Sequence, residues 1–257
     1  MPNTANTAKK RIDFDNVPTG VSLSEDNVQR LSDRATETAT AFHRKLDKLQ
    51  ATFAEARDRY SRDAEAMIAD ASPEDRSAAR AFAKKNDANK IAELRRSLIS
   101  NSEGERAELL RALKTYSDEA EAVAAVCVTP AMMLGRVALG EPKRTQYQQQ
   151  LEGAGPVELE TAARQAVMSG DVVLAAAVAA VIDRRTRDRR PFPVADLAER
   201  VMGEVHDRVN AKLEGVRLAY KTAVAADREF VRGKADPLMN LSLALSRQAA
   251  AEAEGEE

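Results

Sequence analysis

Residues 22–71 read SLSEDNVQRLSDRATETATAFHRKLDKLQATFAEARDRYSRDAEAMIADA and contain neither glycine nor proline. Apolar or small side chains recur there at steps of three, four or seven residues, which is the spacing of one helix face. This stripe consists of Val28, Leu31, Ala35, Phe42, Leu46, Leu49, Phe53, Ala56, Tyr60, Ala64 and Met67. Ser22, with Glu25 three residues later, is arranged as a capping box at the helix start. We therefore predict one helix of roughly 70 Å, at about 1.5 Å per residue.

A stripe of this length needs a covering surface along the whole helix, because an isolated amphipathic helix leaves its apolar face in water. That surface belongs either to the same chain or to a second copy. The mean spacing of the stripe is nearer 3.6 than 3.5 residues, so a left-handed coiled-coil dimer is not demanded. The side chains that we assign to a protein interface are Leu31, Phe42, Leu46, Leu49, Phe53 and Tyr60.

Proline and glycine mark the ends of the other predicted helices. Ser72-Pro73 and Thr129-Pro130 each place a capping side chain before a proline, which suits the first turn of a helix. Residues 101–104, Asn-Ser-Glu-Gly, predict a break between these two starts, with Ser102 beginning a further helix. A second long amphipathic helix is predicted after Pro193.

A helical hairpin is predicted ahead of that second long helix. At its turn, Gly170 can adopt the left-handed conformation and Asp171 can cap the next helix. No sustained two-residue alternation and no Asn-Gly or Asp-Gly turn indicates a strand. The predicted fold class is all-α: an elongated helical bundle built on two long amphipathic helices, with shorter helices and one helical hairpin between them.

Five segments follow from these boundaries. Residues 1–21 are predicted to form a disordered N-terminal arm, and residues 22–140 contain the first long helix and the helices after it. Residues 141–156 form a linker, and residues 157–236 contain the hairpin and the second long helix. Residues 237–257 are expected to form a short helix and an acidic tail.

The short C-terminal helix carries a narrow row of leucines. Helical spacing puts Leu238, Leu241 and Leu245 on one face, a ridge of the kind that fits a groove. The break at Asp236-Pro237 permits this face to pack against its own bundle or against a partner, so we assign the three leucines to an interface.

The sequence lacks the motifs of common enzyme classes. Neither a phosphate-binding glycine loop nor a Gly-x-Ser-x-Gly elbow occurs. His43 and His206 fall outside the usual metal-binding spacings, and ordinary helix-face histidines are expected. Cys127, the only cysteine, cannot form a disulfide within the chain and is expected to be a small buried apolar residue. We predict a non-catalytic protein with no metal site, no cofactor and no small-molecule substrate.

Charge and hydropathy limit the classes of partner that the sequence predicts. The 257 residues include 39 basic and 41 acidic side chains, a balance that gives no general attraction to nucleic acid or to an anionic membrane. The longest strongly apolar run, Val172–Ile182, is shorter than the ~20 residues of a membrane span. We expect a soluble cytoplasmic protein, or one inside an intracellularly assembled particle.

One basic stretch offers an alternative. Residues 183–193 read DRRTRDRRPFP, and a contact with phosphates would use Arg184, Arg185, Arg187, Arg189 and Arg190. Against this, Asp183 and Asp188 are interleaved, and no aromatic side chain lies among the arginines to stack on bases. Cations are also favoured at a helix C-terminus by its dipole. We favour a solvated helix end over a nucleic-acid contact.

Taken with the long stripe, these features favour a non-catalytic scaffold or assembly protein that acts through protein–protein contacts, including self-association. Bacterial and phage structural components often have this character, although no motif here identifies a family. The alternative is a nucleic-acid-associated accessory protein that uses the Arg184–Arg190 cluster.

Overall fold

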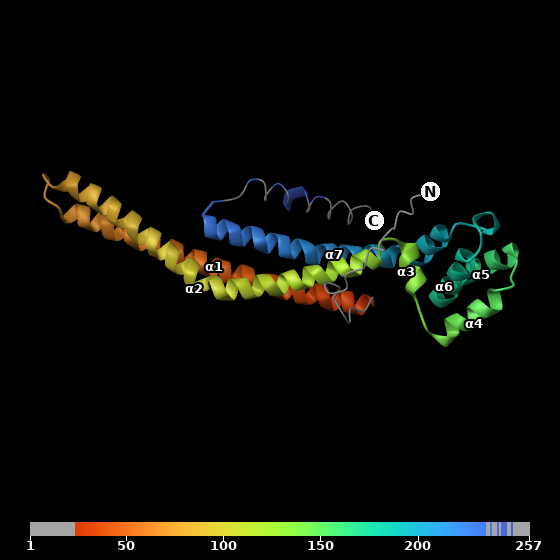
Figure 1. The fold of residues 1–257 in the computed structure, drawn as a ribbon. Coiled ribbons are helices and arrows are strands. Elements are labelled where there is room, and N and C mark those ends of the chain that lie inside the picture. Colours follow the sequence, from red (N-terminus) through yellow and green to blue (C-terminus); the bar gives the residue numbers. More distant parts are fainter. Residues whose placement is uncertain (1–23, 235–236, 238–240, 242, 246–247, 249–257) are drawn as a thin grey trace, which may run out of the picture. The chain divides into compact units, whose positions relative to one another are not determined.

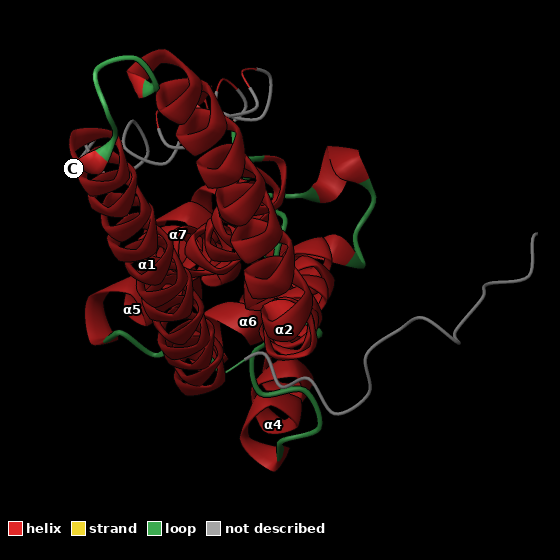
Figure 2. Cartoon of the chain, turned by 90° about the vertical axis from the view of Figure 1, so that its left-hand side faces the viewer, coloured by secondary structure: helices red, strands yellow, loops and turns green. Residues whose placement is uncertain are grey.

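The computed structural model describes residues 24–234, 237, 241, 243–245 and 248. This described part is all-α, as predicted, and Figure 2 shows only helices and loops in it. The long helices are α1 (Glu25–Asp70), α2 (Arg76–Val126) and α7 (Val194–Arg232). Between α2 and α7 lie α3 (Pro130–Arg136), α4 (Pro142–Leu151), α5 (Pro156–Ser169), α6 (Val172–Asp183) and the short 3-10 helix η1 (Arg187–Arg189).

The predicted break at Asn101–Gly104 is wrong, because α2 continues through it. The Ser102 hydroxyl does not cap a new helix but donates to the carbonyl of Leu98, at 2.7 Å, within α2. Gly104 costs a helix about 1 kcal/mol relative to alanine, which the packing of a long helix outweighs. The described part therefore contains three long helices, where the sequence predicted two.

Capping side chains are found at four of the predicted helix starts. Ahead of α2, Ser72 accepts a hydrogen bond from the Asp75 amide at 3.2 Å. Thr129 accepts a hydrogen bond from the Met132 amide at 3.2 Å. In the hairpin turn, Gly170 adopts the left-handed conformation with φ 65°, and Asp171 caps α6. At the start of α1 the cap is Ser24, whose hydroxyl oxygen accepts from the Asn27 amide at 3.2 Å. The predicted cap Ser22 lies outside the described residues, as do residues 1–21.

The chain divides into two compact units, each built from two separate stretches of sequence. Unit 1 comprises residues 1–27 and 118–209, and unit 2 comprises residues 28–117 and 210–257. The passages between units fall within α1, α2 and α7. The predicted linker, residues 141–156, contains α4 and belongs to unit 1.

The core of unit 1 is α6, which packs against α3, α4 and α5 (Figure 1). Its buried residues run almost without interruption from Leu174 to Ile182. A helix that is apolar on all sides is stable only when other elements surround it, which explains this central position. The alanines among these residues allow the neighbouring helices to approach closely.

Asp171 connects α4 to the hairpin turn ahead of α6. Its carboxylate accepts from the Leu174 amide, from Lys143 Nζ and from the Tyr147 hydroxyl, each at 3.0 Å. The Leu174 amide, followed by the Lys143 and Tyr147 side chains, lowers the pKa of Asp171 against the opposing effect of burial. Hydrogen bonding to Asp171 in turn raises the pKa of Lys143.

These pKa shifts predict a pH dependence of stability. The carboxylate of Asp171 contributes stability above its ordinary pKa of 3.8, and this contribution is lost as the pH falls through the lower pKa of the folded state. The Asp171→Asn variant lacks it, so the difference in thermal midpoint between wild type and variant is expected to shrink from neutral pH to about pH 2. Glu152→Gln, at an exposed position, is the control. An equal difference at both pH values would contradict this role for Asp171.

Unit 2 is held together by α1, α2 and α7. Phe42 and Leu46 of α1 meet Leu113 of α2 and Ala223 of α7 in its core. The partly buried residues around them are Ala39, Leu49, Leu109, Leu110, Tyr116, Tyr220, Ala226 and Phe230. Figure 1 shows α1 and α2 side by side and antiparallel, running from the turn that joins them. An ion pair between Lys45 and Glu105 also connects these two helices.

One buried charge in unit 2 is fully paired. Arg106, 4% exposed, forms an ion pair with Asp227 of α7. Its Nε donates to Ser102 Oγ at 3.0 Å and its Nη2 to the Ile99 carbonyl at 3.2 Å. The Phe230 ring centre lies 5.2 Å from the guanidinium carbon. Each nitrogen of Arg106 thus has a partner, as a buried charge requires.

Candidate functional site

The apolar stripe of α1 is largely covered within the chain. Of the residues assigned to an interface, Leu31, Phe42 and Leu46 are buried. Leu49, Phe53 and Tyr60 are half-buried. In the core of unit 2 the covering residues come from α2 and α7.

The C-terminal leucines differ from the α1 stripe in their exposure to solvent. Leu241 and Leu245 are each 58% exposed, whereas Leu243 between them is buried. Leu238 lies outside the described residues. Two of the three leucines assigned to an interface are therefore open to solvent.

The five arginines of the 183–193 stretch divide into two groups. Arg185 donates to the Ala154 carbonyl. Arg190 folds back, pairing with the Asp183 carboxylate at 3.3 Å and donating to the Arg185 carbonyl at 3.1 Å. These two arginines stabilise the turn between α6 and α7. The other three are exposed and form no ion pair with a described residue: Arg184, Arg187 and Arg189.

His206 and Cys127 meet at the end of α2. His206 Nε2 lies 3.1 Å from the Cys127 carbonyl oxygen, so this ring nitrogen carries the hydrogen in the contact. Burial raises the pKa of the Cys127 thiol, against a smaller opposing effect of Arg136. A buried thiol of raised pKa is a poor nucleophile. His43 packs edge-on to Phe42, with ring centres 5.7 Å apart.

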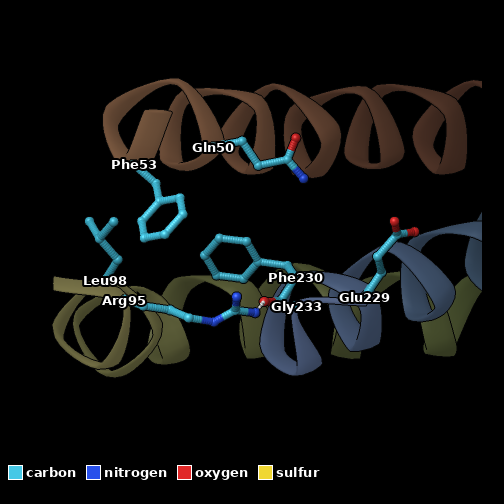
Figure 3. Close-up of a pocket in the computed structure, with 7 residues that line it drawn as sticks. All are labelled: Gln50, Phe53, Arg95, Leu98, Glu229, Phe230 and Gly233. Carbon is cyan, nitrogen blue, oxygen red and sulfur yellow. Dashed lines mark hydrogen bonds between the residues drawn. The ribbon is translucent and has the colours of Figure 1, made fainter. Parts of the chain in front are cut away.

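A cavity of about 190 Å³ lies between α1, α2 and the end of α7 in unit 2. Figure 3 shows the Phe53 and Phe230 rings facing the same space, with Arg95 directed toward Gly233. Arg95 Nη2 donates to the carbonyls of Phe230, at 2.8 Å, and Val231, at 3.4 Å. These are among the carbonyls that the C-terminal turn of a helix leaves without a partner. Arg95 therefore caps α7.

This cap predicts that Gly233→Ala destabilises unit 2. Gly233 has φ +74°, where a side chain is strained, and an added methyl group would overlap the Arg95 guanidinium. The expected loss in free energy of unfolding is about 1–2 kcal/mol from the backbone, plus the loss of the cap. Chemical denaturation checks it. Gly104→Ala is the control, because its methyl group meets nothing within 4 Å and its position inside α2 predicts a gain of about 1 kcal/mol instead of a loss. Equal stability of Gly233→Ala and wild type would contradict the capping role.

An apolar groove of about 460 Å³ lies in unit 1 between α5 and the start of α7. Its apolar lining consists of Ala163, Val167, Met168, Phe192 and Leu197. Charged side chains also line it: Glu160, Arg164, Asp196 and Arg200. Met168 is 87% exposed, an unusual state for a large apolar side chain.

Local structure explains how the groove forms. The buried face of α5 is made by Leu159, Ala163 and Ala166, which leaves Met168 on the opposite side. Phe192 lies between two prolines immediately before α7, and their fixed backbone angles hold it at this position. Sequence reasoning did not single out Met168 or Phe192. The available signal was the placement of Met168 off the apolar face of the predicted hairpin helix.

Comparison with known proteins adds no relative: no protein family, curated protein or solved structure matches the chain. Among the described residues, no three His, Cys, Asp or Glu side chains gather as a metal site requires. No helix in the described ranges has the length and apolar character needed to cross a membrane. The apolar groove, the exposed leucines and the exposed arginines are the surfaces on which a functional proposal rests.

Proposed function

We propose that this chain is a non-catalytic scaffold or assembly protein that acts through protein–protein contacts and self-associates. The observation that supports this proposal is the apolar groove of unit 1, with Met168 at its edge. Apolar hollows rimmed by charged residues are typical of protein contact sites. Covering this surface would gain about 25 cal/mol for each Å² of apolar area removed from water.

The use of the charged residues also favours a structural protein. Arg95 caps α7, and Arg106 pairs with Asp227 inside unit 2. Arg185 and Arg190 stabilise the turn before α7. Each of these cations has a partner within the fold, so its interactions stabilise helix packing or a turn. We extend the proposal to a cytoplasmic role in an assembled particle, such as those of bacteria and phages.

The test is whether the groove mediates self-association. In sedimentation velocity over a concentration series, wild type is expected to form oligomers. Met168→Asp places a charge in the apolar contact and is expected to weaken association by about tenfold or more, an effect of at least ~1.4 kcal/mol. Leu139→Asp makes the same type of change at a residue 66% exposed and outside the groove, so it is the matched control. A monomeric wild type, or equal effects of the two variants, would overturn the proposal.

The alternative function, association with nucleic acid, has one observation in its favour. Arg184, Arg187 and Arg189 remain exposed on one turn. It predicts steeply salt-dependent binding that disappears when these three become glutamine. Our proposal predicts no retention of DNA or RNA in a filter-binding titration at low salt. Retention that the glutamine variant abolishes would favour the alternative.

A further inference from the structure

We propose that the groove of unit 1 receives the C-terminal leucine segment of a second copy of this chain. This inference rests on the proposed self-association and names the surface that occupies the groove. The contacting residues would be Leu241 and Leu245 of one copy, and Met168, Val167 and Phe192 of the other. The contact joins two different surfaces, so each copy both offers a segment and accepts one.

The leucine segment has the geometry of a groove-binding helix. Residues 237, 241, 243–245 and 248 are helical. Leu241 and Leu245 are four residues apart and therefore share a helix face, while Leu243 points to the nearly opposite side. Leu243 is buried and the other two are 58% exposed. Leu243 is thus covered, whereas Leu241 and Leu245 present an apolar ridge with the i, i+4 spacing of helices that bind in grooves.

The groove complements this ridge in polarity. Five of its lining residues are apolar, and they lie on α5, on the start of α7 and in the turn that precedes α7. Met168 is the most exposed large apolar residue among those described, at 87%. Two leucine side chains placed against it would cover surface that is costly to leave in water.

Charge identifies the occupant as this chain's own C-terminal region. Four of the six residues 252–257 are glutamates. Phe192, which lines the groove, follows closely in sequence the turn that carries exposed Arg184, Arg187 and Arg189. Glu252 follows Leu245 by seven residues, a span of up to roughly 25 Å when extended. If the leucines bind in the groove, the acidic residues of the same copy are therefore expected to reach the arginine turn. Glu160 and Asp196 line the groove itself and are not part of that turn.

The symmetry of the contact determines how many copies an oligomer can contain. A contact between two different surfaces is heterologous, and such contacts form closed rings or open chains of copies. A groove-to-groove contact would stop at a dimer. The inference therefore predicts oligomers larger than two at high concentration, weakened by salt because part of the attraction is between opposite charges.

Mixing two blocked variants tests the inference. Met168→Asp blocks the groove but leaves the ridge, and the double variant Leu241→Asp/Leu245→Asp blocks the ridge but leaves the groove. Each alone is expected to be monomeric by sedimentation velocity. An equimolar mixture is expected to form a 1:1 dimer and nothing larger, because one intact groove and one intact ridge remain per pair. All changed side chains are exposed, and unchanged circular dichroism and thermal midpoints verify that both variants fold.

Other outcomes separate this inference from the proposed function. If Met168→Asp abolishes association but the ridge variant assembles like wild type, the groove is a contact site and the assigned occupant is wrong. A monomeric mixture also overturns the inference. If wild type is itself monomeric, both proposals fail together. A further variant, Arg184→Gln/Arg187→Gln/Arg189→Gln, tests the charge contribution. It is expected to raise the dissociation constant for self-association and to make that constant less dependent on salt. An unchanged dissociation constant would show that the acidic residues 252–257 take no part in the contact.

Discussion

Phe42→Ala is expected to lower the free energy of unfolding by about 3–5 kcal/mol, the range for removing a buried aromatic ring. Phe42 has 0% exposure and lies among Leu46, Leu113 and Ala223, which come from three long helices. Its removal leaves a cavity that these helices cannot close, because each is also held by packing elsewhere along its length. The thermal midpoint is expected to fall by roughly 6–20 °C.

The chain supplies a matched control for this prediction. Phe82 of α2 is 63% exposed, so Phe82→Ala removes the same group from a site that is already in water. Its effect is expected to remain within about 0.5 kcal/mol. Chemical denaturation of both variants, followed by circular dichroism, measures the difference. Similar losses for Phe42→Ala and Phe82→Ala would contradict the position of the core.

Asp227→Ala is expected to cost about 3 kcal/mol, because it leaves the Arg106 charge buried without its counterion. We place the value at the low end of the range for buried pairs since the Asp227 side chain is 20% exposed. Arg228→Ala, at the exposed neighbouring position, is the control.

A double variant distinguishes the pair from its individual residues. Arg106→Met/Asp227→Leu replaces both charges by apolar side chains, and buried pairs changed in this way are often as stable as the original. We therefore expect the double variant to be more stable than Asp227→Ala, a strongly non-additive result in denaturant unfolding. Losses that simply add would mean that Arg106 and Asp227 do not depend on one another.

Local signals in the sequence predicted much of the fold. The three- and four-residue spacing located α1, and its stripe is buried or half-buried from Val28 to Ala64. The Gly170-Asp171 turn was predicted correctly because glycine favours the left-handed conformation and aspartate caps a helix by short-range chemistry. Both signals depend on residues within about one helical turn of each other.

The wrong prediction at Asn101–Gly104 shows where such signals fail. Its residues favour a helix end when considered alone, yet Ser102 bonds to Leu98 and Arg106 within a continuous helix. The packing of the long helix outweighs the local preference, and the pairing of Arg106 with Asp227, 121 residues further along the chain, is part of that packing. A pairing over that separation leaves no periodic trace in the sequence.

The candidate site depends on information of the same kind. The sequence identified the C-terminal leucines by their spacing, but the groove required knowledge of which face of α5 is buried. Met168 is exposed because Leu159, Ala163 and Ala166 take the side of α5 that is buried in unit 1. Apolar content alone does not distinguish Met168 from these core residues.

Because each unit is built from two separate stretches of sequence, no single cut in the chain separates the two units. Unit 1 uses residues 1–27 and 118–209, and unit 2 uses residues 28–117 and 210–257. A premature stop codon or a gene fusion that ends at residue 117 would therefore remove most of unit 1 and would also remove the part of helix α7 that belongs to unit 2. Neither unit can be isolated by trimming an end, because residues 28–117 of unit 2 lie between the two stretches of unit 1, and residues 118–209 of unit 1 lie between those of unit 2.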